Sequence, residues 1–430
     1  MFRAHMRSTM RAVGRGLAAA LAGLAALTTT GVAQSATTAA AERVEHDIWY
    51  LAADAREGRG VGTAGLDSAA HFLAGRFAQI GLEPAGTDGY FQPFEIDPTA
   101  PGAAHTNLGG TPVMNVIGAI PGRGALASEV VVLGAHYDHL GYGGFGSLDP
   151  DSNGVIHNGA DDNGSGTAAL IESARLLVNR SAASHRTLLF VSFTAEEMGL
   201  IGSQHYASHP VRPNESTLAM INFDMVGRLR SDSLIVIGVG SATELQGLVE
   251  SSNQRFGLAL SWQPDPWGRS DHSSFYAQQI PVVHFFTNLH EDYHRSTDDW
   301  DKINSAGIAR VAALASDLAW DLAQRPEGLT FQDVPPPAPA TAQAGRRASL
   351  GTIPDMTSSP GGVRLTGVRS GSAAEEAGLQ GGDIIVQIGA HEVPDLMGLQ
   401  QALMALKAGD TVTIVFMRDG ERKEATATLK

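Results

Sequence analysis

Residues 129–139 read EVVVLGAHYDH, an apolar run that ends in two histidines and an aspartate. The run has no alternating polar position, so it is typical of a strand buried on both faces of a sheet. Further buried strands are expected at 113–120, 187–193, 218–223 and 281–286, and helices at 69–80, 167–179, 243–256 and 305–323. Strands that alternate with helices predict an α/β domain, with a mostly parallel sheet flanked by helices.

Polar clusters follow several of these strands at the point where each strand ends. They are His136 with Asp138, and residues 194–197, 222–224 and 293–298, and a fifth cluster at residues 159–166 opens a helix. Taken singly, each cluster is explained by a helix cap or a polar loop. Taken together, at the edge where an open parallel sheet binds its ligands, these histidines and carboxylates favour a divalent-metal site.

The five clusters, in this order, resemble the M28 family of dinuclear zinc peptidases, which includes aminopeptidases, and the resemblance spans about residues 45–325. It implies two Zn²⁺ ions per chain, with Asp161 as the bridging ligand, His136 and Asp224 at one ion, and Glu197 and His294 at the other. It also implies a cis peptide bond between Asp161 and Asp162.

The charges of this ligand set agree with hydrolytic chemistry. Two Zn²⁺ ions bring +4 and the three carboxylates bring −3, which leaves +1 and favours ionisation of a water that bridges the metals. Glu196 precedes a ligand and is itself unligated, so it is expected to act as the general base. Asp138 resembles the carboxylate that orients His136, and Asp298 is expected to orient His294 in the same way.

Three weaker candidates lie outside this ligand set. Some family members place a tyrosine hydroxyl against the reaction intermediate, but the comparable residue here is Trp267. His272 is expected either to donate in its place or to pack as an ordinary loop histidine. Residues 290–294 read HEDYH and match the zincin pattern, but their loop-like context argues against a metal-binding helix. Residues 149–154 resemble the start of a calcium loop, yet Ala160 stands where a glutamate is needed, so calcium is only a weak alternative.

The C-terminal part of the chain reads as a separate unit. Residues 326–346 include a proline- and alanine-rich stretch and predict a linker, and residues 347–430 resemble a PDZ domain of the bacterial protease-associated type. The resemblance is carried by residues 349–353 (SLGTI), 368–374 (VRSGSAA) and 377–385 (AGLQGGDII). It implies a groove that takes a peptide as an added strand, with the peptide carboxylate held at Leu350 and Gly351. The alternative is a module that packs against the catalytic domain and binds nothing.

The N-terminal sequence and the composition indicate where the protein is located and which partners it is expected to lack. Residues 1–41 combine four arginines, a short apolar run and small residues, which predicts a Sec-type signal peptide, a secreted or periplasmic protein and no membrane span after cleavage. The chain has no cysteine, which excludes disulfides, thiolate ligands and a lipoprotein anchor. Loss of the four arginines takes the formal charge from −15 to −19, which disfavours binding to nucleic acids.

The sequence therefore predicts an exported aminopeptidase, with residues 42–325 as its peptidase domain, that removes N-terminal residues from peptides through a metal-bridging water. Its expected partners are peptides with a free N-terminus and a C-terminal peptide ligand of the PDZ domain. One alternative is carboxypeptidase or glutaminyl-cyclase-like chemistry on the same scaffold, and the cyclase predicts a single metal. The other is an idle catalytic domain beside a peptide-binding PDZ adaptor, although an idle site has no need to keep Glu196.

Overall fold

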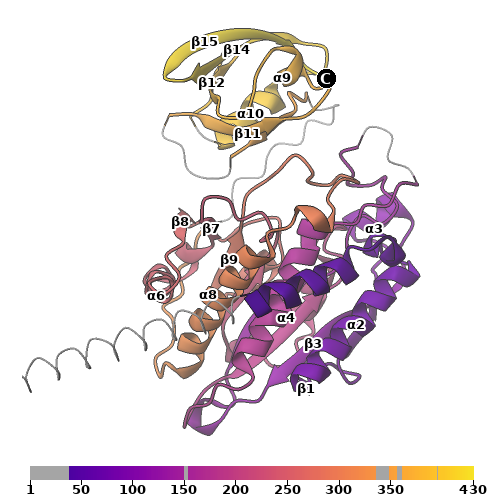
Figure 1. Ribbon diagram of the computed structural model, residues 1–430, viewed down its shortest axis with the longest axis vertical. Helices are drawn as coiled ribbons and strands as arrows, with labels where there is room; N and C mark the ends of the chain where they lie inside the picture. Colours follow the sequence, from indigo (N-terminus) through magenta and orange to yellow (C-terminus); the bar gives the residue numbers. More distant parts are fainter. Residues whose placement is uncertain (1–37, 150–153, 336–347, 356–360, 395) are drawn as a thin grey trace, which may run out of the picture.

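The computed structural model describes residues 38–149, 154–335, 348–355, 361–394 and 396–430, which form two domains (Figure 1). Residues 1–37, and with them most of the predicted signal peptide, lie outside the described residues. The described chain opens with a helix over residues 38–51, so the expected boundary at residue 41 falls within this helix. No helix among the described residues combines the length and apolar composition needed to cross a membrane.

The larger domain is built on a nine-stranded mixed sheet with the order β1-β3-β5-β4-β6-β9-β7-β8, in which β2 also pairs with β3. Its strands are β1 Glu83–Pro84, β2 Phe91–Glu95, β3 Pro112–Ile120, β4 Val130–His136, β5 Thr187–Phe193, β6 Thr217–Phe223, β7 Ser233–Ile237, β8 Ala259–Gln263 and β9 Val282–Phe286. The central strands β5, β4, β6 and β9 run parallel, whereas β3 and β7 join them antiparallel. The α/β prediction is confirmed, with the parallel pairing concentrated at the centre of the sheet.

Strand β4 explains why the fold follows from one apolar run. Val131, Leu133 and Ala135 lie in the core on one face of the sheet, while Val130 and Val132 lie in the core on the other face. Successive side chains of a strand point to opposite faces, so a strand covered on both sides needs apolar residues at every position. All seven residues of β4 are buried, and its last residue, His136, therefore enters the domain where the apolar run ends.

Helices cover both faces of this sheet. The helix over residues 38–51 packs on one face with α2 Ala64–Ile80, α4 Gly166–Leu177, α6 Leu245–Asn253 and α8 Ser305–Gln324. The shorter helices α5 Ile201–Ser208 and α7 His272–Tyr276 contact each other on the opposite face, and α3 Pro101–Thr106 precedes β3. The Thr63 side chain caps α2 by accepting from the Leu66 N–H, and Gly81 ends the helix in the left-handed conformation.

The smaller domain is an antiparallel sheet with the order β10-β11-β12-β14-β15, in which β13 also pairs with β12. Its elements are β10 Thr352–Pro354, β11 Val363–Val368, α9 Ala373–Glu376, β12 Ile384–Ile388, β13 His391–Glu392, α10 Leu396–Ala405, β14 Thr411–Arg418 and β15 Glu421–Thr428. Buried Asp383 accepts from Arg418 and from the Gln380 N–H, which ties the turn before β12 to the hairpin. The domain has its own apolar core, as its separate sequence signature predicts.

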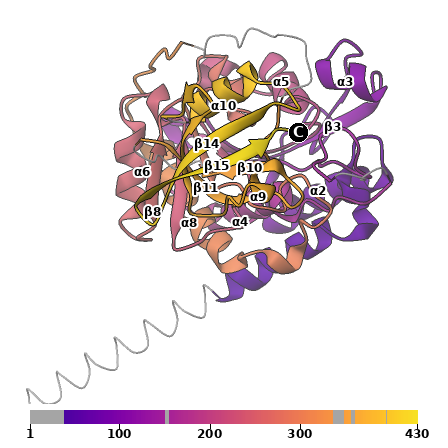
Figure 2. The same ribbon diagram turned by 90° about the horizontal axis from the view of Figure 1, so that it is seen from above.

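The two domains meet at loops of the larger domain, and Figure 2 shows the smaller sheet lying over one end of that domain. The Asn288 side chain donates to Asp355 Oδ1 at 2.7 Å across this contact. The first residues of the expected linker pack on the larger domain, because Phe331 bridges to Ala242 and the Val334 N–H donates to Tyr276 Oη. Residues 336–347 of the expected linker lie outside the described residues.

Candidate metal centre

A cluster of histidines and carboxylates forms where the strands of the larger sheet end. His136 is the last residue of β4, Glu196 and Glu197 follow β5, and Asp224 follows β6. Asp162 lies in the turn at Ala160–Ser165 that opens α4, and His294 lies in the loop after β9. The structure thus brings together four of the five expected ligands, His136, Glu197, Asp224 and His294, with the expected base Glu196 beside them.

Asp162 lies at the centre of this cluster and presents one oxygen to each histidine. Its Oδ1 is 3.4 Å from His136 Nε2, and its Oδ2 is 3.2 Å from His294 Nε2. His136 Nε2 is also 3.5 Å from Asp224 Oδ1, and His294 Nε2 is 3.1 Å from Glu197 Oε2. Ligand atoms roughly 3.4 Å apart suit a tetrahedral ion with bonds of about 2.1 Å, so the cluster fits two adjacent zinc sites.

The expectation that Asp161 is the bridge does not match this geometry. Asp161 turns away from the cluster, with its Oδ1 accepting from the Gly227 N–H at 2.7 Å and its Oδ2 3.1 Å from His290 Nε2. The cis peptide bond joins Asp162 to Asn163, so its expected position between Asp161 and Asp162 is wrong. Two adjacent aspartates in one turn point to different sides, and the sequence alone does not say which one faces the site.

Main-chain carbonyls orient both imidazoles. His136 Nδ1 lies 3.2 Å from the Asp138 carbonyl oxygen, and His294 Nδ1 lies 2.8 Å from the Gly146 carbonyl oxygen. These partners make Nδ1 the protonated nitrogen in each ring and leave Nε2 free to act as a ligand. Asp298 was expected to orient His294, but in the structure its hydrogen bonds go to other groups.

Asp298 instead holds the turn that carries Asp162. It is fully buried, and its Oδ2 accepts from the N–H groups of Asp161 at 2.9 Å and Asp162 at 3.1 Å. Arg228 donates to Asp298 Oδ1 at 3.0 Å and to Asp292 at 3.1 Å, which supplies the positive charge that a buried carboxylate needs. The position of the Asp162 side chain therefore depends on an ion-pair network behind it.

Asp138 performs a comparable task for the two glutamates. Its Oδ1 accepts from the Glu196 N–H at 3.0 Å, and its Oδ2 accepts from the Glu197 N–H at 3.3 Å. Its Oδ1 also lies 3.7 Å from His136 Nδ1, so the expected proximity to His136 holds, although the carbonyl oxygen of Asp138 is closer. Asp138 thus holds Glu196 and Glu197 through their main-chain N–H groups, and it also contacts the ring of His136.

His139 joins the cluster although the sequence analysis did not include it. Its Nδ1 is 2.6 Å from Glu197 Oε1, and it groups with Asp162 and Glu197 within 4.8 Å, as His136, Glu196 and Asp224 also group. The Nε2 of His294 faces Asp162 and Glu197 Oε2, whereas His139 contacts the other oxygen of Glu197 through Nδ1. The signal was present, since His139 follows His136 in the same HYDH motif.

The electrostatics of the cluster indicate that it requires positive charge. Burial lowers the pKa of His294, but Glu197 and Asp162 outweigh this effect and raise the pKa to about 11. Burial raises the pKa of Glu197, yet His294 and His139 outweigh it and lower the pKa to about 2. Burial also raises the pKa of Glu196 well above its ordinary value, and neighbouring carboxylates add to this. Carboxylates that draw protons onto histidines are ready to bind cations instead.

Tyr293 is a second residue that the sequence analysis missed. Its ring stacks on His294 with centroids 3.9 Å apart. Burial raises its pKa well above the ordinary value, and Asp162 and Glu197 add to the effect, so the phenol stays protonated close to the cluster. Nothing in the local sequence marks this residue except that it directly precedes His294.

Trp267 and His272, which the sequence offered as possible contacts of the reaction intermediate, are both packed against other aromatic rings. Trp267 Nε1 donates to the Val334 carbonyl, and the ring packs edge-on against Tyr276. His272 stacks on His284 with centroids 4.6 Å apart, and burial lowers the pKa of His272 to about 3. Among the described residues, neither ring nitrogen of His272 has a hydrogen-bond partner, which agrees with the alternative of a packed histidine.

Three further sequence patterns can be compared with the structure. Residues 290–294 form a loop and turn rather than a helix, and His290 faces Asp161, so the zincin pattern is coincidental. Residues 150–153 of the calcium-like loop lie outside the described residues, and Asp149 accepts hydrogen bonds from Ser296. The proposed PDZ loop residues differ in exposure, since Leu350 is fully buried while Gly351 is half-buried with φ +74°.

Arg59 anchors the segment that precedes the domain's sheet to the metal centre. Its guanidinium is fully buried and donates to four carbonyl oxygens, those of Leu51, Tyr137, Asn158 and Gly159, each at 2.7 Å. Burial lowers the pKa of Arg59 to about 10, so the group stays charged at neutral pH. The chain on either side of the cluster is thereby tied to the N-terminal helices.

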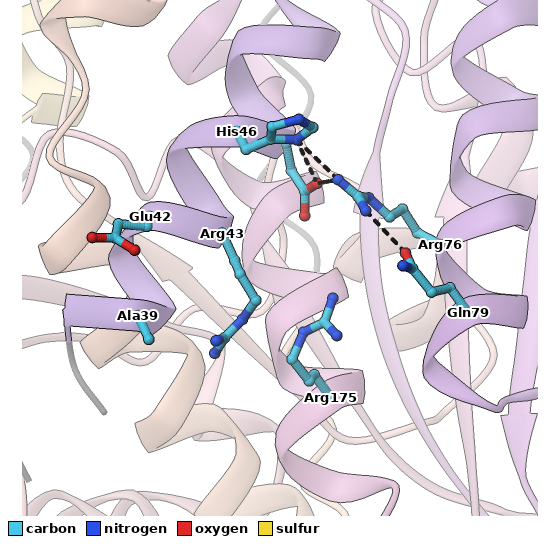
Figure 3. A pocket seen from close by; sticks show the side chains of 8 residues that line it. Ala39, Glu42, Arg43, His46, Arg76, Gln79 and Arg175 are labelled. Atoms are coloured by element: carbon cyan, nitrogen blue, oxygen red, sulfur yellow. Dashed lines mark hydrogen bonds and ion pairs between the residues drawn. The ribbon is translucent and has the colours of Figure 1, made fainter. Parts of the chain in front are cut away.

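A separate polar pocket lies between the helix over residues 38–51, α2 and α4 (Figure 3). It includes three arginines, but Arg43 is engaged by Glu172 and Arg76 by Asp47. None of the clustered histidines and carboxylates lines this pocket. Its cations are neutralised by partners from the same chain, so we assign no binding role to it.

Comparisons with known proteins agree with this geometry. Residues 115–319 match Peptidase family M28, and residues 348–429 match the PDZ domain. The chain is 27% identical over 222 residues to Aminopeptidase YwaD of Bacillus subtilis (strain 168), covering 49% of this chain and 45% of that protein. It is 31% identical over 174 residues to Leucine aminopeptidase 2 of Trichophyton equinum, covering 38% of this chain and 32% of that protein. The chain thus spans less than half the length of these two relatives.

Solved structures share the fold. BSAP, a zinc aminopeptidase from Bacillus subtilis, superposes with a TM-score of 0.54 at 18% identity, covering 69% of this chain and 98% of that chain. Bacteroides thetaiotaomicron glutaminyl cyclase superposes with a TM-score of 0.52 at 17% identity, covering 66% of this chain and 97% of that chain. Because the sequence identity is low, these two neighbours show only that this chain shares their fold.

Proposed function

Because residues 115–319 match Peptidase family M28 and residues 348–429 match the PDZ domain, we propose that the protein is an exported zinc aminopeptidase acting on peptides. The observation that carries the proposal is the position of Asp162, whose two oxygens face two histidines at 3.4 and 3.2 Å. That arrangement suits a carboxylate shared by two metal ions. Export is supported by the composition of residues 1–41.

The residues that would hold the metals form two sets around Asp162. His136 and Asp224 complete one set, and Glu197 and His294 complete the other. When bound, two Zn²⁺ ions supply Lewis-acid polarisation of the scissile carbonyl and lower the pKa of water. The ligands bring a charge of −3 against +4, so the centre keeps a net positive charge that stabilises a developing oxyanion.

Glu196 is the proposed general base and acid. Its side chain lies beside the ligands, with Oε2 3.9 Å from His136 Nε2, and the residue is only 8% exposed. Burial raises its pKa well above the ordinary value, so its carboxylate is a stronger proton acceptor than that of an exposed glutamate. It would take a proton from the attacking water and deliver it to the leaving amine.

Tyr293 is the proposed hydrogen-bond donor to the developing oxyanion. Its stacking on His294 holds the phenol beside the cluster, and burial with nearby carboxylates keeps the hydroxyl protonated. A fixed O–H donor aimed at developing negative charge lowers the barrier to acyl transfer. This role replaces the one weighed for His272, whose ring packs on His284 instead.

The preference for a free N-terminus follows from the metals that this centre would hold. A neutral terminal amine would offer its nitrogen lone pair to one of the ions, whereas the nitrogen of an acylated N-terminus has no available lone pair. The glutaminyl-cyclase alternative rests on a shared fold, but Asp162 and Asp224 supply ligands for two ions rather than one.

For the PDZ domain we propose that Leu350 and Gly351 hold the carboxylate of a peptide ligand, as in the family it matches.

The test combines metal content with substrate selectivity. Zinc per chain is measured alongside hydrolysis of a panel of amino-acid p-nitroanilides and their N-acetylated counterparts, before and after chelation and zinc restoration. About two zinc ions, with cleavage of the unblocked substrates alone, would support the aminopeptidase. One zinc ion, or cyclisation of N-terminal glutamine without hydrolysis, would favour the cyclase. Metal-free chain without turnover would favour the PDZ adaptor.

A further inference from the structure

A narrow pocket lies where the PDZ domain meets the catalytic domain, next to the metal centre. The catalytic domain contributes Leu148, Glu291 and Tyr293 to its walls, and the PDZ domain contributes Ile353, Pro354 and Arg369. Tyr293 belongs to both places, because it lines this pocket and its ring stacks on His294. The pocket therefore lies one residue away from the cluster of histidines and carboxylates, with a wall supplied by the PDZ domain.

Arg369 is a cation without a counterion in this pocket. It is half-buried, and no carboxylate of the described residues lies within ion-pair distance of its guanidinium. Arg295 lies near it and is paired with Asp149 at 3.6 Å, so Arg369 faces a like charge as well. Burial and the nearby charge of Arg295 both lower the pKa of Arg369, because each disfavours the charged form of the guanidinium. An anion bound at Arg369 would stabilise the charged form.

Two features decide which anion fits. Glu291 also lines the pocket, but it is exposed, and among the described residues it forms no ion pair with Arg369. Four apolar residues, Leu148, Leu289, Ile353 and Pro354, make up much of the remaining wall beside His290 and Thr352, so the pocket suits a charged group carried on an apolar stem. The free carboxylate at the end of a peptide has this character, and Arg binds carboxylates through two parallel hydrogen bonds.

We infer that Arg369, supplied by the PDZ domain, binds the C-terminal carboxylate of short peptide substrates whose N-terminus occupies the metal centre. The inference rests on the proposed aminopeptidase function and names its substrate class. The position of Arg369 over the catalytic domain is fixed by the Asn288–Asp355 hydrogen bond and by the pairing of its N–H with the Gly351 carbonyl oxygen. The PDZ domain would then act in part as a wall that selects peptide length.

The experiment compares peptide acids with their amides in the full-length chain. Hydrolysis of Leu-Gly, Leu-Gly-Gly and Leu-Gly-Gly-Gly is measured beside that of the corresponding C-terminal amides, for the wild type, Arg369→Gln, Arg369→Lys and Arg364→Gln. Arg364 is the matched control, because it is an exposed arginine on strand β11 of the same domain. Leucine p-nitroanilide, which has no carboxylate, reports on each preparation whether the active site is assembled.

For at least one length, the wild type is expected to favour the acid over the amide by about tenfold or more in kcat/KM, through KM, as expected for a charge-assisted hydrogen bond. Arg369→Gln should bring the ratio close to one, Arg369→Lys should keep part of it, and Arg364→Gln should leave it unchanged. A wild type that hydrolyses the p-nitroanilide yet treats acids and amides alike overturns this inference alone, as does an Arg369→Gln chain that keeps the preference. A wild type that hydrolyses no free-amine substrate overturns the proposed function beneath it.

Discussion

Replacing Asp298 by asparagine tests whether the metal centre depends on the network behind it. Asp298 is fully buried and accepts from the N–H groups of Asp161 and Asp162 with one oxygen, and from Arg228 with the other. An asparagine of the same shape can accept hydrogen bonds from only one of these two sets of donors through its carbonyl oxygen. It presents its amide N–H₂ group to the other set. The side that loses its acceptor is either the turn carrying Asp162 or the Arg228 guanidinium.

The magnitude follows from the groups left without a partner. Each buried N–H that loses its acceptor costs about 1–3 kcal/mol, and a buried cation that loses one of its two carboxylates costs a similar amount or more. We therefore expect Asp298→Asn to lower the free energy of unfolding by roughly 2–4 kcal/mol. Because the turn at Asp162 is loosened, zinc affinity should fall by about 10- to 100-fold, the range seen when residues that orient ligands are changed.

The assay pairs urea unfolding with competition for zinc against a chelator. Asp292→Asn is the matched control, because Asp292 also accepts from Arg228 and lies outside the hydrogen bonds to the Asp162 turn. It should lower stability while leaving zinc affinity close to that of the wild type. Wild-type zinc affinity in Asp298→Asn, or an equal loss of affinity in both variants, would refute the idea that Asp298 acts through the turn.

Three further changes probe the reacting groups. Glu196→Gln should keep the zinc content and lower kcat by about 10²- to 10⁴-fold, and substantial residual turnover would remove Glu196 as the base. Asp162→Asn should reduce bound zinc from two ions to one or none, whereas Asp161→Asn should retain both ions; the reverse pattern, read by metal analysis, would restore Asp161 as the bridge. Tyr293→Phe should lower kcat by about 10²-fold or more with little change in KM, and Trp267→Phe should behave as wild type in the same steady-state assay.

The strands at the centre of the sheet were predictable from sequence because burial on both faces leaves an uninterrupted apolar run. β5 was expected at residues 187–193 and is found at Thr187–Phe193. β8 at Ala259–Gln263 is an edge strand with partly exposed residues, and α7 at His272–Tyr276 has five residues. Such elements owe their structure to neighbours that are distant in sequence, so neither the apolar pattern nor local propensity marks them.

The candidate site divides in a similar way. His136, Glu197 and Asp224 lie at or just after strand ends, so their meeting at one edge of the sheet could be predicted from sequence, whereas their expected roles as ligands came from the family resemblance. The choice between Asp161 and Asp162 could not be predicted, because it depends on which side of a turn each residue faces. The partner of Asp298 was also inaccessible, since hydrogen bonds across 136 and 137 residues leave no local signal.

The four hydrogen bonds of Arg59 redefine which part of the chain folds as one piece. The M28 match begins at residue 115, yet Arg59 joins the carbonyl of Leu51 to those of Tyr137 and Gly159 on the near side of the metal ligands. An expression fragment that starts at residue 115 lacks both Arg59 and Leu51, so the carbonyl oxygens of Tyr137 and Gly159 would lose their donor and the apolar face covered by the first helices would be exposed. Boundaries for producing the isolated larger domain therefore belong ahead of residue 38, well outside the segment that sequence similarity delimits.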